Sequence, residues 1–175
     1  MKNGTILLWK YKKSKGLIDF VSRLIVFFTN FPYVHVSIFL DGKTYEYTVW
    51  KDGKKTKTGI RITNGLREAD EYREPTFDLS AHEVFTMIKY AEWLKPHKYS
   101  VLKLLVLSVI YPARWLFKKI KWVPFDNFIF GDVCSVLPAE MYEFIGRDIF
   151  PYDPAGITVP GMWAETQYFE TKTRD

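Results

Sequence analysis

The stretch VHVSIFLDGKTYEYTVW, residues 34–50, carries the clearest β signal in the chain. Side chains alternate in character over residues 34–40, which is typical of a strand with two different faces. The Asp-Gly pair at 41–42 predicts a two-residue hairpin turn, after which residues 43–50 return as the second strand. One face of the first strand carries Val34, Val36, Ile38 and Leu40, and the other carries His35, Ser37 and Phe39.

The turn sets the register of this hairpin, and the register brings a carboxylate near a histidine. With Leu40 opposite Lys43, His35 lies opposite Thr48 and Glu46 is its diagonal neighbour on the same face. Diagonal neighbours lie about 7–8 Å apart at the base of their side chains, within reach of a glutamate. A carboxylate in that place fixes the tautomer of an imidazole and stabilises its charged form. Taken singly, the simpler interpretation is a half-buried strand histidine and a solvated glutamate.

The segments around the hairpin predict further strands and helices. Residues 5–9 and 59–63 are expected as strands, and residues 64–75 as a charged, irregular segment. Ser80 and Glu83 form a capping box for a helix that reaches about Leu94. A helix is also expected over residues 17–29, with an apolar side made of Leu17, Phe20, Val21, Leu24, Phe27 and Phe28.

The predicted fold class is therefore α+β, with a small antiparallel sheet that contains residues 34–40, 43–50 and 59–63. A length of 175 residues and 47% hydrophobic content suit one domain over 1–175. Residues 164–175 are polar and are expected to be a loose C-terminal tail. Residues 101–122 are expected to be helical with a break at Pro112, and the segment 113–122 is basic and aromatic.

The only cysteine, Cys134, stands at the start of a second informative stretch, residues 129–146. Apolar residues recur there at helical spacing, Asp132 is a candidate N-cap, and Gly146 is a candidate stop. Pro138 moves the expected start toward Ser135 or bends the helix. Unpaired N–H groups at a helix start favour the thiolate, the reactive form of the side chain. The alternative is a small buried hydrophobe, the usual role of a lone cysteine.

Composition excludes several classes of site. One cysteine rules out an internal disulfide and any multi-cysteine metal site, and His35, His82 and His97 lack metal-ligand spacing. No cofactor or metal is expected, and no phosphate loop or specific nucleic-acid signature is present. The net charge of +5 permits an anionic membrane surface as a partner without requiring one. The apolar runs near the N-terminus and at 101–117 are too short or too charged for a signal peptide or a membrane span, so a cytoplasmic location is expected.

The order of these parts resembles the circularly permuted NlpC-type group of papain-like cysteine hydrolases, and within it the YiiX-like proteins. The resemblance covers roughly residues 4–62 and 128–163: an aromatic-Xaa-His strand, a Gly turn, a Glu strand, and much later Cys134-Ser135 at a helix start. A Thr-Xaa-Pro-Gly segment, 158–161, follows. Gly4-Thr5 stands where the family has Gly-Asp, and Pro138 interrupts a helix that is continuous in the family.

The resemblance implies a papain-like fold and a set of roles. Cys134 is the nucleophile, His35 the general base, Glu46 the residue that orients His35, and Tyr33 a weaker candidate for assisting an oxyanion. The implied activity is a peptidase-like or amidase-like thiol hydrolase that cleaves an amide or ester through a thioester. A peptide or lipid-like acyl compound is the expected substrate. The alternatives are a lipid acyl hydrolase or acyltransferase, a non-catalytic lipid-binding or peptide-binding module, and a protein that acts through its basic, aromatic surface.

Overall fold

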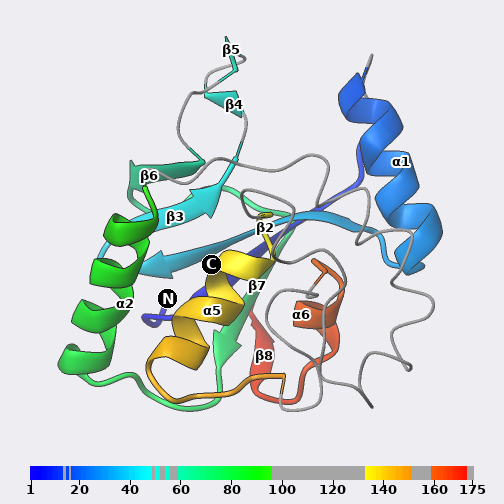
Figure 1. Cartoon of the computed structure of the whole chain (residues 1–175). Coiled ribbons are helices and arrows are strands. Elements are labelled where there is room, and N and C mark those ends of the chain that lie inside the picture. The colour runs from blue at the N-terminus through cyan, green and yellow to red at the C-terminus, as the bar shows by residue number, and fades with distance from the viewer. Residues whose placement is uncertain are drawn as a thin grey trace, which may run out of the picture.

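The computed structural model describes residues 1–13, 15, 17–48, 50–51, 54–55, 59–95, 133–150 and 159–172. This part of the chain is α+β, with a six-stranded antiparallel sheet in the order β6-β3-β2-β1-β7-β8 (Figure 1). The strands of the sheet are β1 (Thr5–Lys10), β2 (Tyr33–Leu40), β3 (Lys43–Tyr47), β6 (Ile60–Asn64), β7 (Glu71–Pro75) and β8 (Phe169–Lys172). The helices are α1 (Leu17–Thr29), α2 (Ala81–Leu94), α5 (Val136–Phe144) and α6 (Met162–Glu165), and a separate hairpin joins β4 (Trp50–Lys51) and β5 (Lys54–Lys55).

The predicted hairpin is confirmed at its turn. Leu40 pairs with Lys43, Phe39 with Thr44, and Ile38 with Tyr45. Positive φ angles at Asp41 and Gly42 are those that a tight two-residue turn requires. Beyond Tyr45, β3 pairs with β6 and not with β2, so the predicted pairing of His35 with Thr48 is not formed. The two strands therefore stop pairing before the chain reaches His35.

The core lies between the sheet and the helices. Val36, Ile38 and Leu40 on β2 are fully buried, as their alternation predicted, and they join a cluster with residues of α2 and α5. Figure 1 shows α5 in front of the sheet, with α2 and α6 on either side of it. The apolar face of β2 thus supplies the surface on which α5 packs.

Helix α5 begins later than the helical spacing of its apolar residues alone suggested. Its N-cap is Ser135, so Pro138 falls in the first turn, where a missing N–H is tolerated. Gly146 follows the helix with φ of 77° and ends it, as predicted. The N-cap is therefore not Asp132, as was expected. Asp132 itself and the expected helix at 101–122 lie outside the described residues.

Three expectations are corrected. Residues 169–172 are not a loose tail but form β8, because Phe169 packs into the core while the strand pairs with β7. Within the segment 64–75, expected as irregular, residues 71–75 form β7, whose main-chain groups are satisfied by β1 and β8. The expected three-stranded sheet therefore has additional strands on the β1 side.

Helix α1 has the predicted bounds but a different buried side. Ile25 and Asp19 are buried, whereas Phe20 and Phe27 are 57% and 78% exposed. The Asp19 carboxylate is held by the Tyr11 hydroxyl and by Arg23, which explains how an acid is accommodated on the inward side. In the described part of the chain, no helix combines the length and apolar character needed to cross a membrane.

Candidate active site

The structure brings Cys134 and His35 together, although 98 residues separate them in sequence. Cys134 lies in the turn before α5, is 1% exposed, and belongs to the main core cluster. His35 lies on β2 beyond the point where β2 and β3 stop pairing. The two side chains share a hydrogen bond and a charge interaction. Because His35 Nε2 faces Glu46, Nδ1 is the ring nitrogen left for the sulfur.

Glu46 lies next to His35, as predicted, although the strand pairing on which that prediction was based ends before His35. Its Oε2 is 2.8 Å from His35 Nε2, and its side chain is only 1% exposed. Burial on its own would raise the pKa of this carboxyl, but hydrogen bonds and charges from His35, Arg61 and Arg67 lower it to about 2. Glu46 is therefore ionised over the whole physiological pH range.

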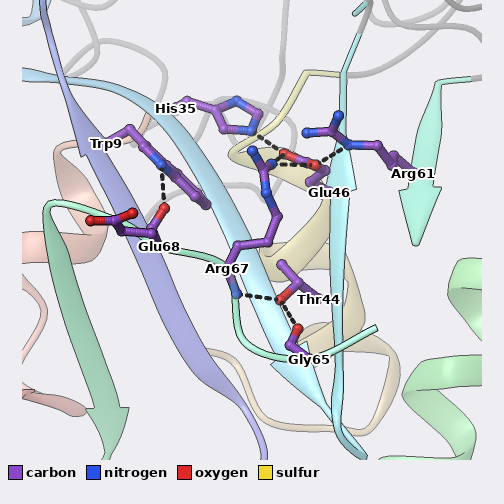
Figure 2. A network of polar contacts seen from close by, with 8 residues as sticks. All are labelled: Trp9, His35, Thr44, Glu46, Arg61, Gly65, Arg67 and Glu68. Atoms are coloured by element: carbon purple, nitrogen blue, oxygen red, sulfur yellow. Dashed lines mark hydrogen bonds and ion pairs between the residues drawn. The ribbon is translucent and has the colours of Figure 1, made fainter. Parts of the chain in front are cut away.

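Two arginines complete the environment of Glu46. Arg61, which pairs with Glu46 across the β3–β6 ladder, donates from Nε to Oε1. Arg67, from the loop between β6 and β7, donates from Nη1 to Oε1 at 2.5 Å and to Oε2 at 2.6 Å. One buried carboxylate thus accepts from three cationic or ionisable groups (Figure 2).

These neighbours also determine the charge of His35. Burial lowers the pKa of the imidazole, but the charge of Cys134, the hydrogen bond to it, and then Glu46 outweigh burial and raise the pKa to about 9. His35 consequently keeps its proton at neutral pH when the sulfur opposite is a thiolate. In general, a thiolate next to an imidazolium is more reactive as a nucleophile at neutral pH than a free thiol.

Trp9 forms one wall of this site. Its ring centroid lies 5.1 Å from that of His35 in a tilted arrangement, and the Arg67 guanidinium lies 5.3 Å from the indole centroid. The indole Nε1 donates to the Glu68 carbonyl at 2.9 Å, which fixes the ring (Figure 2). The His35–Glu46 contact is therefore enclosed by an aromatic ring as well as by arginines.

Tyr33 is placed differently from His35. The β1–β2 pairing shifts register between Trp9 and Lys10, opposite residues 33–35, and such a bulge breaks the two-residue alternation of a strand. Tyr33 joins the main core cluster, and its hydroxyl donates to Glu71 Oε2 at 2.5 Å. Its pKa is raised to about 12 by burial and by Glu71. The donor of this hydroxyl is engaged by Glu71, and a role in assisting an oxyanion stays a prediction.

Trp9, Arg61 and Arg67 were not identified from the sequence. The face on which Arg61 lies could have been predicted. It stands between Ile60 and Ile62 in a predicted strand, and neighbouring residues of a strand point to opposite faces. Arg67 had no such signal, because it stands in a charged segment without periodicity. Trp9 belonged to an expected strand, but nothing in the sequence linked that strand to His35.

Comparison with protein-family models finds no model that matches this chain, and comparison with curated proteins finds no match either. Among the described residues, no group of three His, Cys, Asp or Glu side chains is arranged to hold a metal ion.

Proposed function

We propose that this protein is a cysteine hydrolase of the circularly permuted, papain-like kind, acting on an amide or ester bond through a thioester. The observation that carries the proposal is that one imidazole, that of His35, interacts both with the Cys134 sulfur and with the Glu46 carboxylate. A nucleophile, a base and a group that orients the base are the minimum set for this chemistry. The α+β sheet with the cysteine helix packed on β2 is compatible with such a fold.

In the proposed reaction the Cys134 thiolate attacks the carbonyl carbon while His35 carries the proton. The new S–C bond produces an oxyanion, which the backbone N–H of Cys134 helps to stabilise. The bond to the leaving nitrogen or oxygen then breaks as His35 transfers its proton to that atom. A water molecule gives a proton to His35, attacks the thioester, and releases the acid together with the thiolate. Glu46 stabilises the imidazolium before His35 gives up its proton and again after His35 takes a proton from water.

The substrate expected from the resemblance is a peptide or lipid-like acyl compound. Trp9 and the arginines around Glu46 make the surroundings of His35 aromatic and cationic. An acyl acceptor other than water would make the same site an acyltransferase. The acyl donor therefore has to be identified by screening peptide and lipid esters and amides.

The first test is the rate of Cys134 alkylation by iodoacetamide across pH. We expect the parent protein to react at a plateau rate well below pH 8.5, the approximate pKa of a free thiol, because His35 stabilises the thiolate. The plateau should disappear in His35→Ala and persist in His82→Ala, which removes an exposed histidine from the start of α2. Loss of hydrolysis in Cys134→Ala, measured on any donor found by screening, would complete the assignment.

An ordinary thiol titration that ignores His35 would contradict the proposal. It would favour a non-catalytic module of the same fold that holds an acyl chain or peptide. Retained function after mutation of Cys134, with loss on mutation of Lys118, Lys119 and Lys121, would instead favour action through the basic, aromatic surface.

A further inference from the structure

The contacts of Glu46 exceed what orienting a histidine requires. His35 engages only Oε2, whereas Arg61 and Arg67 both reach Oε1, and Arg67 reaches Oε2 as well. Both Arg67 contacts come from one nitrogen, Nη1, which lies within hydrogen-bond distance of the two carboxylate oxygens and bridges them. Since Arg67 touches both oxygens, it controls the direction in which Oε2 faces His35.

The loop that carries Arg67 is anchored by side chains of three strands. Thr44 Oγ1 on β3 donates to the Gly65 carbonyl at 2.8 Å and accepts from the Arg67 N–H at 3.3 Å. The Tyr72 hydroxyl on β7 donates to the Arg67 carbonyl at 3.2 Å. On β1, Trp9 Nε1 donates to the Glu68 carbonyl (Figure 2). The backbone on both sides of Arg67 is thus held by groups outside the loop.

Without these cations Glu46 would lose its charge more easily. A carboxyl with 1% exposure is disfavoured as an anion by desolvation, which here acts against the hydrogen bonds that keep it ionised. A protonated Glu46 would no longer stabilise the positive charge of His35, and the thiolate opposite would lose its counter-ion. The ionisation of Glu46 is therefore linked to the reactivity of Cys134.

We infer that Arg67 is a positioning residue of this site: the anchored loop 65–70 presents its guanidinium to Glu46 and holds the carboxylate charged and aimed at His35. Arg61 supports the same carboxylate from β6. The inference rests on the proposed function, because its consequence for reactivity passes through the Cys134–His35 pair. The Arg67 guanidinium contacts Glu46 and the Trp9 ring, and its effect on the sulfur passes through Glu46.

The direction of the effect follows from the groups that face the pair. Glu46 is faced by His35 from β2, Arg61 from β6 and Arg67 from the loop, and His35 is faced in addition by Cys134. Removing the Arg67 cation raises the pKa of Glu46, because the charge of Arg67 is one of the causes that lower it. A less fully ionised Glu46 stabilises the imidazolium less, so the pH at which the thiolate forms moves upward. Loss of the Arg67 cation also removes a repulsion of the His35 imidazolium. That effect acts in the opposite direction and reaches Cys134 only through His35.

The test compares Arg67→Gln with a matched arginine elsewhere. Arg147 also donates to a glutamate, Glu83, and the pKa of that carboxyl is likewise lowered to about 2, but the pair joins α2 to the segment after α5. On the acid limb we expect Arg67→Gln to be alkylated about tenfold more slowly than the parent, the change that corresponds to a shift of one pH unit. The rates should converge near pH 8. Arg147→Gln should follow the parent curve, and Arg67→Lys should fall between the two.

A second readout does not depend on catalysis. In a Cys134→Ala background, the Glu46 carboxyl carbon is followed by NMR against pH and assigned by its absence in Glu46→Gln. Its titration should move upward in Arg67→Gln and remain unchanged in Arg147→Gln. If parent Cys134 proves to be an ordinary thiol while the Glu46 titration moves, the proposed function fails and the positioning of Glu46 stands.

Equal Glu46 titrations in Arg67→Gln and Arg147→Gln would overturn the inference. If Arg67→Gln does not fold, as judged by circular dichroism, Thr44→Val replaces it. That variant keeps the guanidinium and the volume at position 44 but removes both loop hydrogen bonds of Thr44. We expect a smaller shift of the acid limb in the same direction, and an unshifted limb would count equally against the inference.

Discussion

Glu46 illustrates how a single residue can link stability to chemistry. Its carboxylate is among the most deeply buried side chains of the described chain, and it accepts from His35, Arg61 and Arg67. Removing one partner of a buried ion pair leaves the other charge uncompensated, at a cost of about 3–5 kcal/mol for fully buried pairs. Because the two arginines are 20% and 31% exposed, that figure is a ceiling for Glu46→Gln.

The pH dependence of stability follows from the same carboxylate. Its folded pKa of about 2 lies below the ordinary value of 4.5, so its contribution is complete above pH 4.5 and is lost as pH falls toward 2. We expect the urea-derived free energy of unfolding to fall more steeply over this range in the parent than in Glu46→Gln. Asp78→Asn, which alters an 85% exposed carboxylate, is the control and should keep the parent slope. Identical slopes in parent and Glu46→Gln would refute this assignment.

At the scale of elements, the position of α5 depends on its close approach to Gly4, the residue before β1. The Tyr142 hydroxyl donates to the Gly4 carbonyl at 2.9 Å, and a Cβ on Gly4 would collide with that hydroxyl and with Leu79. Gly4 also has φ of 88°, a conformation that residues with a Cβ rarely adopt. The position of the helix that follows Cys134 therefore relies on a glycine at the opposite end of the chain.

This contact can be separated from backbone strain by a pair of variants. Gly4→Ala and Gly146→Ala both place a Cβ at positive φ, but at Gly146 no atom of the described residues lies within 4 Å of the added group. We expect Gly4→Ala to lower the free energy of unfolding by about 1–3 kcal/mol more than Gly146→Ala, the usual range for overpacking. Chemical denaturation of both variants measures the difference. Equal losses would mean that Tyr142 does not constrain α5 through Gly4.

At the scale of the whole molecule, the first and last strands of the described chain belong to the same sheet, with β7 between them. β8 pairs with β7, which pairs with β1, and Phe169 packs edge-on against Tyr142 and Trp163 with centroids 5.7 Å and 5.5 Å away. The same aromatic cluster contacts α5 through Tyr142. Residues near the C-terminus consequently support the helix that presents Cys134.

The role of β8 is tested by two substitutions in one strand. Phe169 is 3% exposed. We expect Phe169→Ala to lower the free energy of unfolding by about 3–5 kcal/mol, the typical loss for a buried phenylalanine. Glu170→Ala, one residue along on the exposed side, should change stability by less than about 0.5 kcal/mol. Thermal or urea denaturation distinguishes the two, and a neutral Phe169→Ala would restore the view of residues 164–175 as a loose tail.

Local patterns were sufficient for the elements near the site. Strict alternation, an Asp-Gly turn and a capping box predicted β2, the start of β3 and the bounds of α2, because each depends on neighbours in sequence. The predicted contact between Glu46 and His35 is present, but the register that predicted it holds only from Ile38 to the turn. For α1 the bounds were right and the buried side was wrong, since helical spacing indicates which residues share a face but not which face meets the protein.

What the sequence by itself determined is the hairpin turn with the register beside it, and the presence of the cysteine, histidine and glutamate that the proposed function requires. Only the tertiary structure decided that β7 and β8 complete the sheet, that Trp9 and two arginines surround the His35–Glu46 contact, and that Cys134 reaches His35. The physical reason is that the two kinds of interaction act over different distances along the chain. Dihedral preferences and side-chain alternation act over a few residues, whereas the charge of a buried carboxylate depends on every group that packing brings to it, whatever its distance along the chain.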